Sequence, residues 1–361
     1  MDAASVRRAR LQSQLLDVPA PDVAGAAAHI TATQAQEFWG GRWALGVRTG
    51  GEPTLSEVDA AFESGALVRA WTQRGTLHIV AARDLAWILR VTRDRQLQQF
   101  ASVRRGHGIP EEHVEVAARA VGAALAGGNR LTRAEFAAVL TAAGVEATGM
   151  RGNLLLTALA IREDVVLGPV IAREGGPTRD QYLVAPADWI ADAAAPADPL
   201  AALFVGYIRS HGPAGVDDFR WWAGLPVGVA RSAREAASDR VVEVDDGLFV
   251  VSAPPPAQAF REPVAADPAV LALPPFDEYY LSYADRTLAC SDAFTARVGP
   301  SIQGLVRPVL VARGEVVGLW THSMAVGRHH RMPVPELFGH VDVPASAVDA
   351  ALARVSRFVT G

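Results

Sequence analysis

Lysine is absent from the sequence. All 34 basic side chains of the 361-residue chain are arginines, and they stand against 39 acidic side chains, which gives a net charge of −5. Without lysine, the protein has no side-chain amine for a Schiff base, for the phosphate contact of a P-loop or for anchoring pyridoxal phosphate. Only the α-amino group could act as an amine nucleophile, so enzyme classes that depend on a lysine are excluded.

Cysteine and long apolar runs are also scarce. The single cysteine, Cys290, excludes an internal disulfide and a zinc site built from several cysteines, and we expect it to be a small, buried apolar residue. No stretch of about 18 apolar residues occurs, so a membrane-spanning helix is not expected. The charged segment 1–22 lacks the apolar core of a secretory signal, and we therefore expect a cytoplasmic protein.

Motifs for cofactors and metal ions are missing as well. Gly40-Gly41 and Gly50-Gly51 lack the strand, turn and helix that a phosphate-binding loop requires. His329 and His330 are adjacent, which would direct them to opposite sides of a strand and makes them poor joint ligands. The sequence therefore predicts neither a cofactor nor a metal site.

Two parts of the chain repeat one order of elements. Apolar periodicity predicts helices at 111–126, 132–142 and 147–163, followed by the strand-like runs VVLGPVI and QYLVA. The same order returns with the runs VVEV and LFVV, which follow predicted helices at 199–211, 215–223 and 227–237. Three helices followed by a two-stranded hairpin are typical of a winged helix-turn-helix.

We therefore predict an α+β protein made of tandem winged helix-turn-helix units with short β-hairpin wings. The predicted segments are an N-terminal winged-helix-like unit, two further winged-helix units, and a β-rich C-terminal part with a hairpin and a closing helix, at 1–110, 111–197, 198–252 and 269–361. The proline-rich stretch 253–268 is predicted to be a linker.

Arginine is concentrated in two stretches. Residues 83–105 carry six arginines against two acids, and residues 303–335 carry four arginines and three histidines against one acid. An acidic protein with such patches can bind a polyanion, because the local field counts for more than the net charge. For 83–105, a merely solvated helix face is an equally good explanation.

A pair of glutamines, Gln34 and Gln36, lies directly before a cluster of large aromatic residues. In an extended segment, residues i and i+2 point to the same side, so the two carboxamides would face one pocket. Carboxamides offer both donors and acceptors and could hold a water molecule there. Taken alone, the pair is also compatible with an ordinary polar loop.

Three longer motifs give these glutamines a context. They are TQAQEFWGGRWALGVR at 33–48, WTQRGTLHIVAARDLAWIL at 71–89 and LALPPFDEYYLSYADR at 271–286. With the two helix-and-hairpin parts between them, they resemble the winged-helix DNA glycosylases of the AlkZ and YcaQ type over nearly the whole chain. The resemblance implies tandem winged helices around a DNA-binding cleft. It also implies a catalytic motif of the form Gln-aliphatic-Gln or Gln-aliphatic-Asp. This chain has the first form, so Gln34 and Gln36 would carry the catalytic role.

The resemblance further implies where DNA is contacted. The C-terminal hairpin of the family would correspond to Thr321–Arg331, and its basic residues would reach the phosphate backbone or the minor groove: His322, Arg328, His329 and Arg331. A predicted strand-turn-strand element either contacts phosphates and lines the lesion pocket or is only structural; its candidate residues are Arg74, Thr76 and His78. The expected partner is double-stranded DNA containing an alkylated purine, bound by a monomer.

The residue types of the motif favour one reaction. A glutamine amide orients water and stabilises nearby positive charge, but it cannot take up a proton as a carboxylate does. Hydrolysis of a glycosidic bond passes through an oxocarbenium-like state and then needs a good leaving group, such as a cationic purine that leaves as the neutral base. We expect removal of N7-alkylguanine-type lesions, bulky natural-product adducts or crosslinks included, in DNA repair or genotoxin self-resistance. The absence of lysine predicts no strand cleavage.

Two alternatives remain compatible with the sequence. One is a winged-helix transcriptional regulator without catalysis, and the other is an inactive family member that only binds DNA. The candidate recognition helices are those predicted at 147–163 and 227–237, and they carry few arginines. This is little positive charge for a regulator, which gains affinity from many phosphate contacts.

Two further residue pairs are interpreted as structural. Asp277 and Glu278 are expected to fix their loop in a local network with Asp285-Arg286 rather than to take part in catalysis. Trp221-Trp222 are expected to pack the core of the third segment rather than to stack on bases.

Overall fold

The protein folds into two compact units. The computed structural model describes residues 1–252, 270–339 and 342–361. The first unit comprises Met1–Val58, Arg173–Pro177 and Leu200–Gly361, and the second comprises Asp59–Ala172 and Thr178–Pro199. These ranges differ from the four predicted segments, whose identity as separate domains stays a prediction. The predicted linker 253–268 lies outside the described residues.

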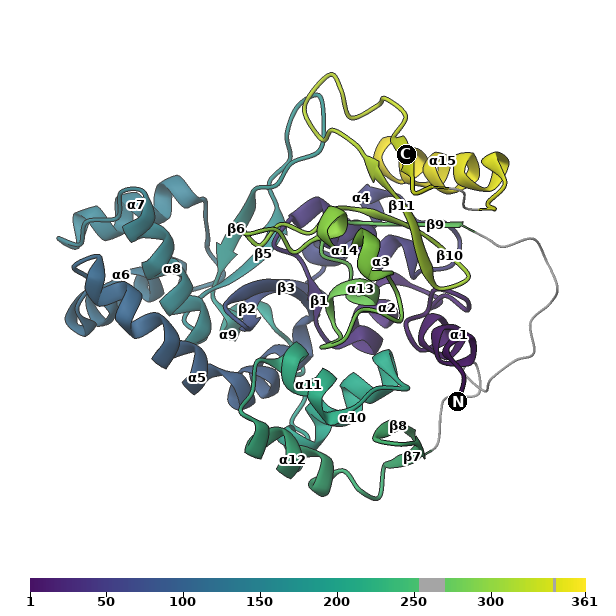
Figure 1. Ribbon diagram of the computed structural model, residues 1–361. Helices are drawn as coiled ribbons and strands as arrows, with labels where there is room; N and C mark the ends of the chain where they lie inside the picture. The colour runs from purple at the N-terminus through teal and green to yellow at the C-terminus, as the bar shows by residue number, and fades with distance from the viewer. Residues whose placement is uncertain (253–269, 340–341) are drawn as a thin grey trace. The chain divides into compact units, whose positions relative to one another are not determined.

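The second unit joins an antiparallel sheet to a group of helices (Figure 1). Its strands lie in the order β3-β2-β5-β6-β4 and are β2 (Leu67–Gln73), β3 (Thr76–Ala81), β4 (Arg130–Leu131), β5 (Val166–Val170) and β6 (Gln181–Val184). Its helices are η1 (Ala82–Asp84), α5 (Leu85–Gly106), α6 (Glu111–Leu125), α7 (Arg133–Ala142), α8 (Met150–Ile161) and α9 (Pro186–Trp189), and the helix α4 (Leu55–Glu63) leads into the unit. Arg74 and Gly75 have φ values of 51° and 69°, which form the tight turn that joins β2 to β3.

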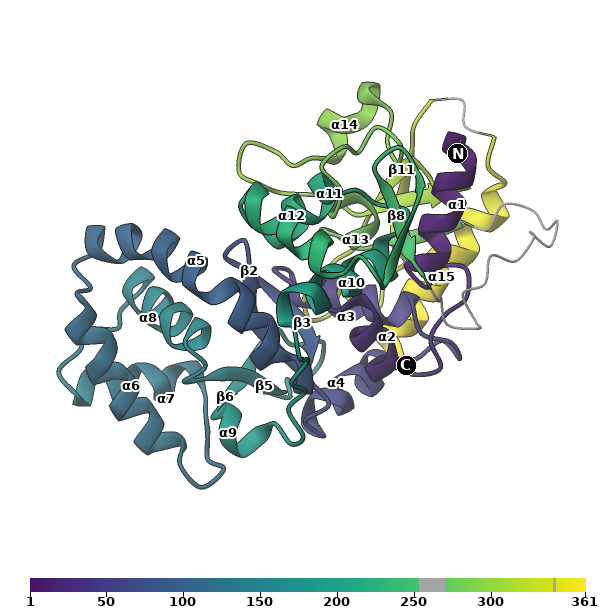
Figure 2. The ribbon, with the colours of Figure 1, turned by 90° about the horizontal axis from the view of Figure 1, so that it is seen from below.

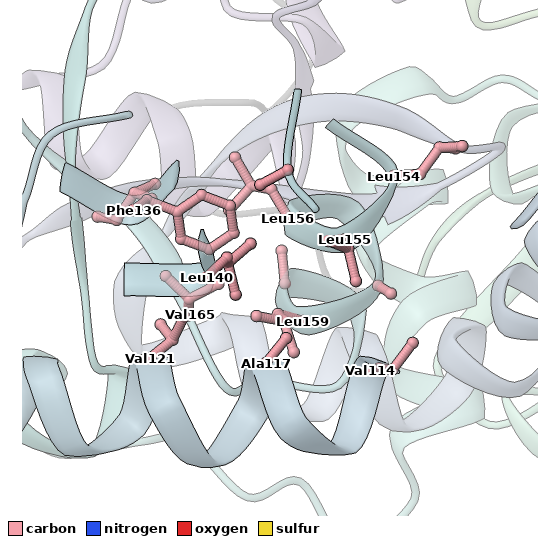
Figure 3. Close-up of a cluster of buried hydrophobic side chains, with 14 of the residues drawn as sticks. Val114, Ala117, Val121, Phe136, Leu140, Leu154, Leu155, Leu156, Leu159 and Val165 are labelled. Atoms are coloured by element: carbon pink, nitrogen blue, oxygen red, sulfur yellow. The ribbon is translucent and has the colours of Figure 1, made fainter. Parts of the chain in front are cut away.

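An apolar cluster holds the helices of the second unit together (Figure 3). On α6, the buried residues recur at spacings of three and four and therefore form one face of the helix: Val114, Ala117, Val121 and Leu125. They pack with buried residues of the two following helices, Phe136, Leu140, Leu155 and Leu159. α7 begins at a capping box, in which Thr132 and Glu135 each bind the main chain of the other.

The first unit contains the remaining elements. Its N-terminal part consists of α1 (Ala3–Ser13), α2 (Val23–Ile30), β1 (Thr33–Gln34) and α3 (Phe38–Val47). A group of three helices and a hairpin follows: α10 (Pro199–His211), α11 (Val216–Ala223), α12 (Val227–Ala236), β7 (Val241–Asp245) and β8 (Leu248–Val251). Figures 1 and 2 both show these three helices grouped beside the hairpin, so the predicted order of three helices and two strands is observed here.

A four-stranded antiparallel sheet completes the first unit. Its order is β12-β11-β10-β9, and its strands are β9 (Val270–Leu273), β10 (Val309–Ala312), β11 (Glu315–Thr321) and β12 (Val334–Leu337). Thr321 pairs with Val334, so residues 322–333 form the connection of the predicted hairpin. The other helices are α13 (Glu278–Leu281), α14 (Asp292–Val298) and α15 (Ala345–Thr360), of which α15 lies beside β9 (Figure 1).

The structure confirms a mixture of helices and antiparallel strands but differs from the sequence prediction in detail. The sequence predicts a helix over 3–17, whereas α1 ends at Ser13 and Leu15 takes a φ of 58°, which no helix continues. The aromatic stretch after the two glutamines forms α3, which was not predicted because two adjacent glycines lie inside it. No helix among the described residues is long and apolar enough to cross a membrane.

Candidate functional site

Gln34 ends the short strand β1, which begins directly after a sharp turn, and Gln36 lies two residues beyond the strand. Thr31 takes a φ of 73° at the end of α2 and turns the chain into β1. α10 comes close to this turn because Gly206 has no side chain; a Cβ there would lie only 2.7 Å from Thr31 Oγ1. Arg209 of α10 donates hydrogen bonds of 2.9 and 3.1 Å to main-chain oxygens at the end of α2. The segment that leads into the motif is thus held by α10.

The two glutamines differ in exposure and in what their side chains contact. Gln34 is only 5% exposed, whereas Gln36 is exposed. Gln34 Oε1 accepts a hydrogen bond of 2.8 Å from the main-chain N–H of Gln36. The strand β1 ends at Gln34. The orientation of both carboxamides toward one pocket stays a prediction.

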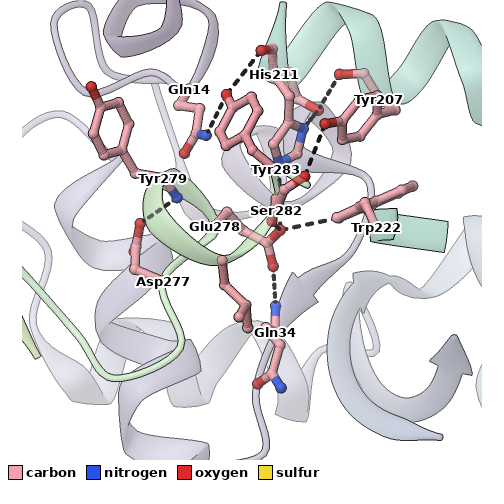
Figure 4. A network of polar contacts seen from close by, with 12 residues as sticks. Gln14, Gln34, Tyr207, His211, Trp222, Asp277, Glu278, Tyr279, Ser282 and Tyr283 are labelled. Carbon is pink, nitrogen blue, oxygen red and sulfur yellow. Dashed lines mark hydrogen bonds and ion pairs between the residues drawn. The ribbon is translucent and has the colours of Figure 1, made fainter. Parts of the chain in front are cut away.

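A buried carboxylate holds the main chain of Gln34 (Figure 4). Glu278, which is 1% exposed, accepts the Gln34 N–H through Oε1 at 2.6 Å. Its Oε2 accepts hydrogen bonds from the Trp222 indole at 3.1 Å and from the Ser282 hydroxyl, and it lies 3.4 Å from His211 Nε2. Residues of β1, α10, α11 and the segment around α13 therefore meet at one carboxylate.

Burial determines the protonation of the groups around Glu278. His211 is completely buried, and burial lowers its pKa although the hydrogen bond to Glu278 opposes this shift, so the imidazole is neutral at pH 7. Its ring stacks on Tyr207 with 4.6 Å between the centroids, and Nδ1 lies 2.8 Å from the Ser210 hydroxyl. Burial also raises the pKa of Tyr283 to about 12 and that of Tyr207 well above its usual value. Both phenols stay protonated and donate to main-chain oxygens.

The neighbouring acid, Asp277, is paired with an arginine. Its carboxylate accepts hydrogen bonds of 2.8 and 2.9 Å from the Arg48 guanidinium, and both side chains are fully buried. Arg48 follows directly after α3 and also donates to Gln14 Oε1 at 2.7 Å. A bidentate pair of this kind fixes the orientation of the two groups as well as their distance. It therefore fastens the loop before α13 to the end of α3.

The predicted network of Asp277 with Asp285 and Arg286 is thus wrong in its partner. Asp285 accepts a 2.8 Å hydrogen bond from the main chain two residues later, and Arg286 lies 4.9 Å from the centre of the Trp221 ring, a cation–π distance. The arginine that binds Asp277 lies 229 residues earlier. Of the two tryptophans expected in the core, Trp222 is fully buried, whereas Trp221 is 39% exposed.

Comparison with known proteins assigns the chain to a family. The profile of the family described as DNA glycosylase AlkZ-like matches residues 27–358. The chain belongs to the AlkZ-like DNA glycosylase family. Among solved structures, it is similar to the Streptomyces sahachiroi DNA glycosylase AlkZ, with a TM-score of 0.79 and 23% sequence identity over 99% of this chain and 96% of that chain. At this identity, the likeness concerns the fold. A search of curated proteins found no match.

The C-terminal hairpin of this AlkZ-like DNA glycosylase presents two arginines to solvent. Arg328 and Arg331 are exposed in the connection 322–333, and within the described part of the chain neither guanidinium forms an ion pair. His322 and His329 are half-buried, and burial lowers the pKa of His322. His322 therefore adds no positive charge at neutral pH.

The three candidate DNA-contact residues on the β2–β3 hairpin differ in burial. Arg74 and Thr76 are half-buried at its turn, whereas His78 is fully buried in β3 with Nδ1 3.0 Å from the Thr76 main-chain oxygen. The structure thus does not bring His78 to a surface that DNA can reach. A DNA contact by the other two stays a prediction.

The arginine-rich stretch 83–105 is partly occupied by ion pairs within the second unit. On α5, Arg93 pairs with Glu163 at 3.2 Å and the buried Arg104 pairs with Glu111 at 3.0 Å. Exposed arginines of the same stretch are Arg83, Arg90, Arg95 and Arg105. Part of this patch therefore serves to join helices, which reduces the charge that it offers to a polyanion.

Among the described residues, neither the lone cysteine nor the metal-binding residue types form a further site. Burial raises the pKa of Cys290, so its thiol is protonated, and the residue is a small buried side chain as predicted. No group of three or more metal-binding side chains occurs among the residues that the structure describes.

Glu278 and His211 were not singled out as partners of the glutamine motif. The segment PPFDEY belongs to one of the three motifs that carry the family resemblance, but nothing in its sequence shows that Glu278 binds a main-chain N–H 244 residues away. Acidic residues mostly lie on the surface of folded proteins. Only its complete burial distinguishes this one.

Proposed function

We propose that the protein is a monofunctional DNA glycosylase that removes cationic alkylated purines, of the N7-alkylguanine type, from double-stranded DNA. The observation that carries the proposal is the fixed position of Gln36, an exposed carboxamide whose main chain is bound to Gln34, which in turn is bound to the buried Glu278. Family membership supports glycosylase chemistry. The groups α6–α8 with β5–β6 and α10–α12 with β7–β8 support tandem winged helices as the DNA-binding framework.

In this proposal the two glutamines have different tasks. Gln34 Oε1 is engaged with the Gln36 N–H, so Gln34 acts as a positioning residue for its neighbour. Gln36 is exposed, and its carbonyl oxygen orients the attacking water and faces the positive charge that develops on the sugar. An amide suits this work because it carries no charge of its own and need not be protonated or deprotonated.

The reaction balances without a strong acid or base. The water oxygen forms a bond to C1′ of the sugar, and the bond between C1′ and the purine nitrogen breaks. Its electron pair moves into the cationic purine, which leaves as a neutral base, and the proton of the water passes to solvent. The oxocarbenium-like state between these events is the one that a fixed carbonyl dipole stabilises. Neutral lesions such as uracil would be poor substrates because their leaving group needs an acid.

The proposed activity stops at an abasic site. A glycosylase that also nicks the strand needs an amine, and the chain has no lysine. Its α-amino group pairs with Asp245. Product DNA is therefore expected to stay intact until it is treated with alkali. A covalent complex trapped by borohydride in a variant with a blocked N-terminus would contradict this expectation.

The proposal is tested by single-turnover excision of 7-methylguanine from a duplex, with one bulky natural-product adduct alongside. Gln36→Ala should lower the rate about tenfold to a hundredfold, at or below the lower end of general acid–base effects. Binding of undamaged DNA should not change, because a neutral amide neutralises no phosphate. Gln36→Asp, which reproduces the Gln-aliphatic-Asp form of the motif, should keep activity.

The matched control is Gln303→Ala, which removes an exposed glutamine from a loop of the same unit. Its rate should equal that of the wild type. If the Gln34→Ala/Gln36→Ala variant excises the base at the wild-type rate, the site assignment is wrong. Sequence-specific binding without any excision by the wild type would favour a regulator instead.

A further inference from the structure

We propose that Glu278 is a positioning residue for base excision, which acts on Gln36 through the main chain and side chain of Gln34. The proposal rests on the function proposed above, in which Gln36 orients the attacking water. In this role Glu278 touches neither the water nor the DNA. It determines where the residue that does so is held.

The contact joins two segments that only the tertiary structure brings together. The Gln34 nitrogen and Glu278 Oε1 are 2.6 Å apart and 244 residues distant in the sequence. α3 comes close to the loop before Glu278 because Gly40 has no side chain; a Cβ there would lie 3.1 Å from Pro275 Cγ. The Arg48–Asp277 pair fastens the same loop from the other end of α3.

Polar neighbours surround both oxygens of Glu278. Three donors face the carboxylate: the Gln34 N–H at Oε1, and the Trp222 indole and the Ser282 hydroxyl at Oε2, which also lies 3.4 Å from His211 Nε2. The main-chain N–H and the indole N–H can only donate, so Oε1 and Oε2 each act as an acceptor.

Two hydrogen bonds in series link Glu278 to Gln36. The bond to Glu278 fixes the peptide plane of Gln34 and therefore the direction in which its side chain leaves the main chain. The bond from the Gln36 N–H to Gln34 Oε1 then fixes Gln36 relative to that side chain. A displacement of a reacting group by about 1 Å can cost about a hundredfold in rate. Loss of the first bond should therefore affect the chemistry and leave DNA binding unchanged.

The substitution Glu278→Gln tests this link with almost no change in shape. The amide has one acceptor oxygen where the carboxylate has two. If that oxygen takes the place of Oε2, where the Trp222 and Ser282 donors converge, the NH₂ group faces the Gln34 N–H and their hydrogen bond is lost. We expect the single-turnover excision rate of 7-methylguanine to fall about tenfold to a hundredfold. The dissociation constant for the undamaged duplex should change by less than about twofold, since phosphate contacts dominate it.

Two control variants separate positioning from mere stability. Ser282→Ala and Trp222→Phe each remove one donor from Oε2 and leave the bond between Glu278 and Gln34 in place. Each should lower the melting temperature, since each loses a buried hydrogen bond. Their excision rates should stay within about threefold of the wild type. If the rates of all three variants instead follow their melting temperatures, the role of Glu278 is purely structural and the proposal is wrong.

A double-mutant cycle provides the readout that a structural role would not produce. Because the link passes through the Gln34 side chain, adding Glu278→Gln to Gln34→Ala should lower the excision rate by less than about threefold. Independent, fully multiplicative losses would overturn the proposal, as would a wild-type rate for Glu278→Gln alone. If Gln36→Ala itself excises at the wild-type rate, the proposed function fails rather than the link.

If Glu278→Gln does not fold, the Ser282→Ala/Trp222→Phe double variant takes its place. It removes the Ser282 and Trp222 donors that hold Oε2 and so loosens the carboxylate that binds Gln34. A decrease of about threefold to tenfold in the excision rate, with unchanged DNA affinity, would support the proposal. A wild-type rate for this variant would overturn it.

Discussion

The best-defined buried regions of the two units are made of opposite kinds of side chain. In the second unit, the cluster around α6, α7 and α8 consists of apolar side chains throughout (Figure 3). In the first unit, the buried region around Glu278 contains a carboxylate, an imidazole and hydroxyl groups, and the Arg48–Asp277 pair lies beside it (Figure 4). The two regions therefore differ in what they contribute to the protein, one through apolar packing and the other through directed polar contacts.

Apolar and polar burial differ in how strongly their free energy depends on the direction of the contacts. Apolar burial stabilises by about 25 cal/mol per Å² wherever the surface is buried, so many side-chain arrangements give almost the same free energy. Burial of a polar group costs free energy unless its partner stands at the right distance and angle. Each buried hydrogen bond in the first unit therefore restricts the position of two groups. We infer that the apolar cluster supplies stability, and that the polar region supplies the geometry of Gln34 and Gln36.

The largest effect is expected when the buried ion pair of the polar region is broken. Asp277→Asn leaves the Arg48 guanidinium as a buried charge without its counterion, and this should lower the free energy of unfolding by about 3–5 kcal/mol. Denaturant unfolding measures the change. Asp285→Asn is the control, because that carboxylate is exposed and should change stability by no more than about 0.5 kcal/mol. Equal losses for the two variants would contradict the structural role of the pair.

A similar loss of stability, without loss of geometry, is expected from the apolar cluster. Leu159→Ala should lower the free energy of unfolding by about 2–5 kcal/mol, since it removes a fully buried side chain and leaves a cavity. Leu159→Met, which conserves volume, should cost less than about 1.5 kcal/mol. The excision rate per folded molecule should be unchanged in both. A lower excision rate for Leu159→Ala at low temperature, where the protein is folded, would contradict the inference that the apolar cluster supplies only stability.

Acid should weaken the first unit through a half-buried histidine of α2. Burial lowers the pKa of His29 to about 4, with the nearby Arg209 acting in the same direction. The unfolded chain therefore binds a proton more readily between pH 6.5 and 4, and stability is lost as the pH falls through this range. The shift corresponds to about 3 kcal/mol. Unfolding measured at pH 7 and pH 4 should show a smaller difference for His29→Gln than for the wild type. An identical pH dependence in the variant would disprove the assignment.

The smallest effect concerns the surface, where neither kind of interior is involved. Arg328→Ala/Arg331→Ala should leave stability and chemistry nearly unchanged and should reduce the slope of log affinity against log salt by about two, one for each lost phosphate contact. Arg8→Ala/Arg357→Ala removes the same charge from α1 and α15 and serves as the control. An unchanged slope for the first pair would show that the hairpin does not touch the DNA backbone.

The sequence predicted most helices of the second unit because their signal is local. On α6, the spacing of the apolar residues can be read directly from the sequence at Val114, Ala117, Val121 and Leu125. The turn at Arg74-Gly75 contains the glycine that such a turn requires. The polar region has no such period. Its members lie on β1, α10, α11 and α13, and nothing local to any of them indicates burial.

The sequence by itself determined what chemistry is absent and which residues are candidates for the rest. The lack of lysine excludes catalysis by a side-chain amine, and the motifs around Gln34, Gln36 and Asp277 led to the family that the profile then matched. Only the tertiary structure decided that Asp277 binds Arg48, that Glu278 binds the Gln34 N–H, and that Gln36 rather than Gln34 is exposed. The reason is that periodicity depends on neighbours in the chain. The partner of a buried polar group, by contrast, depends on which distant segments pack together.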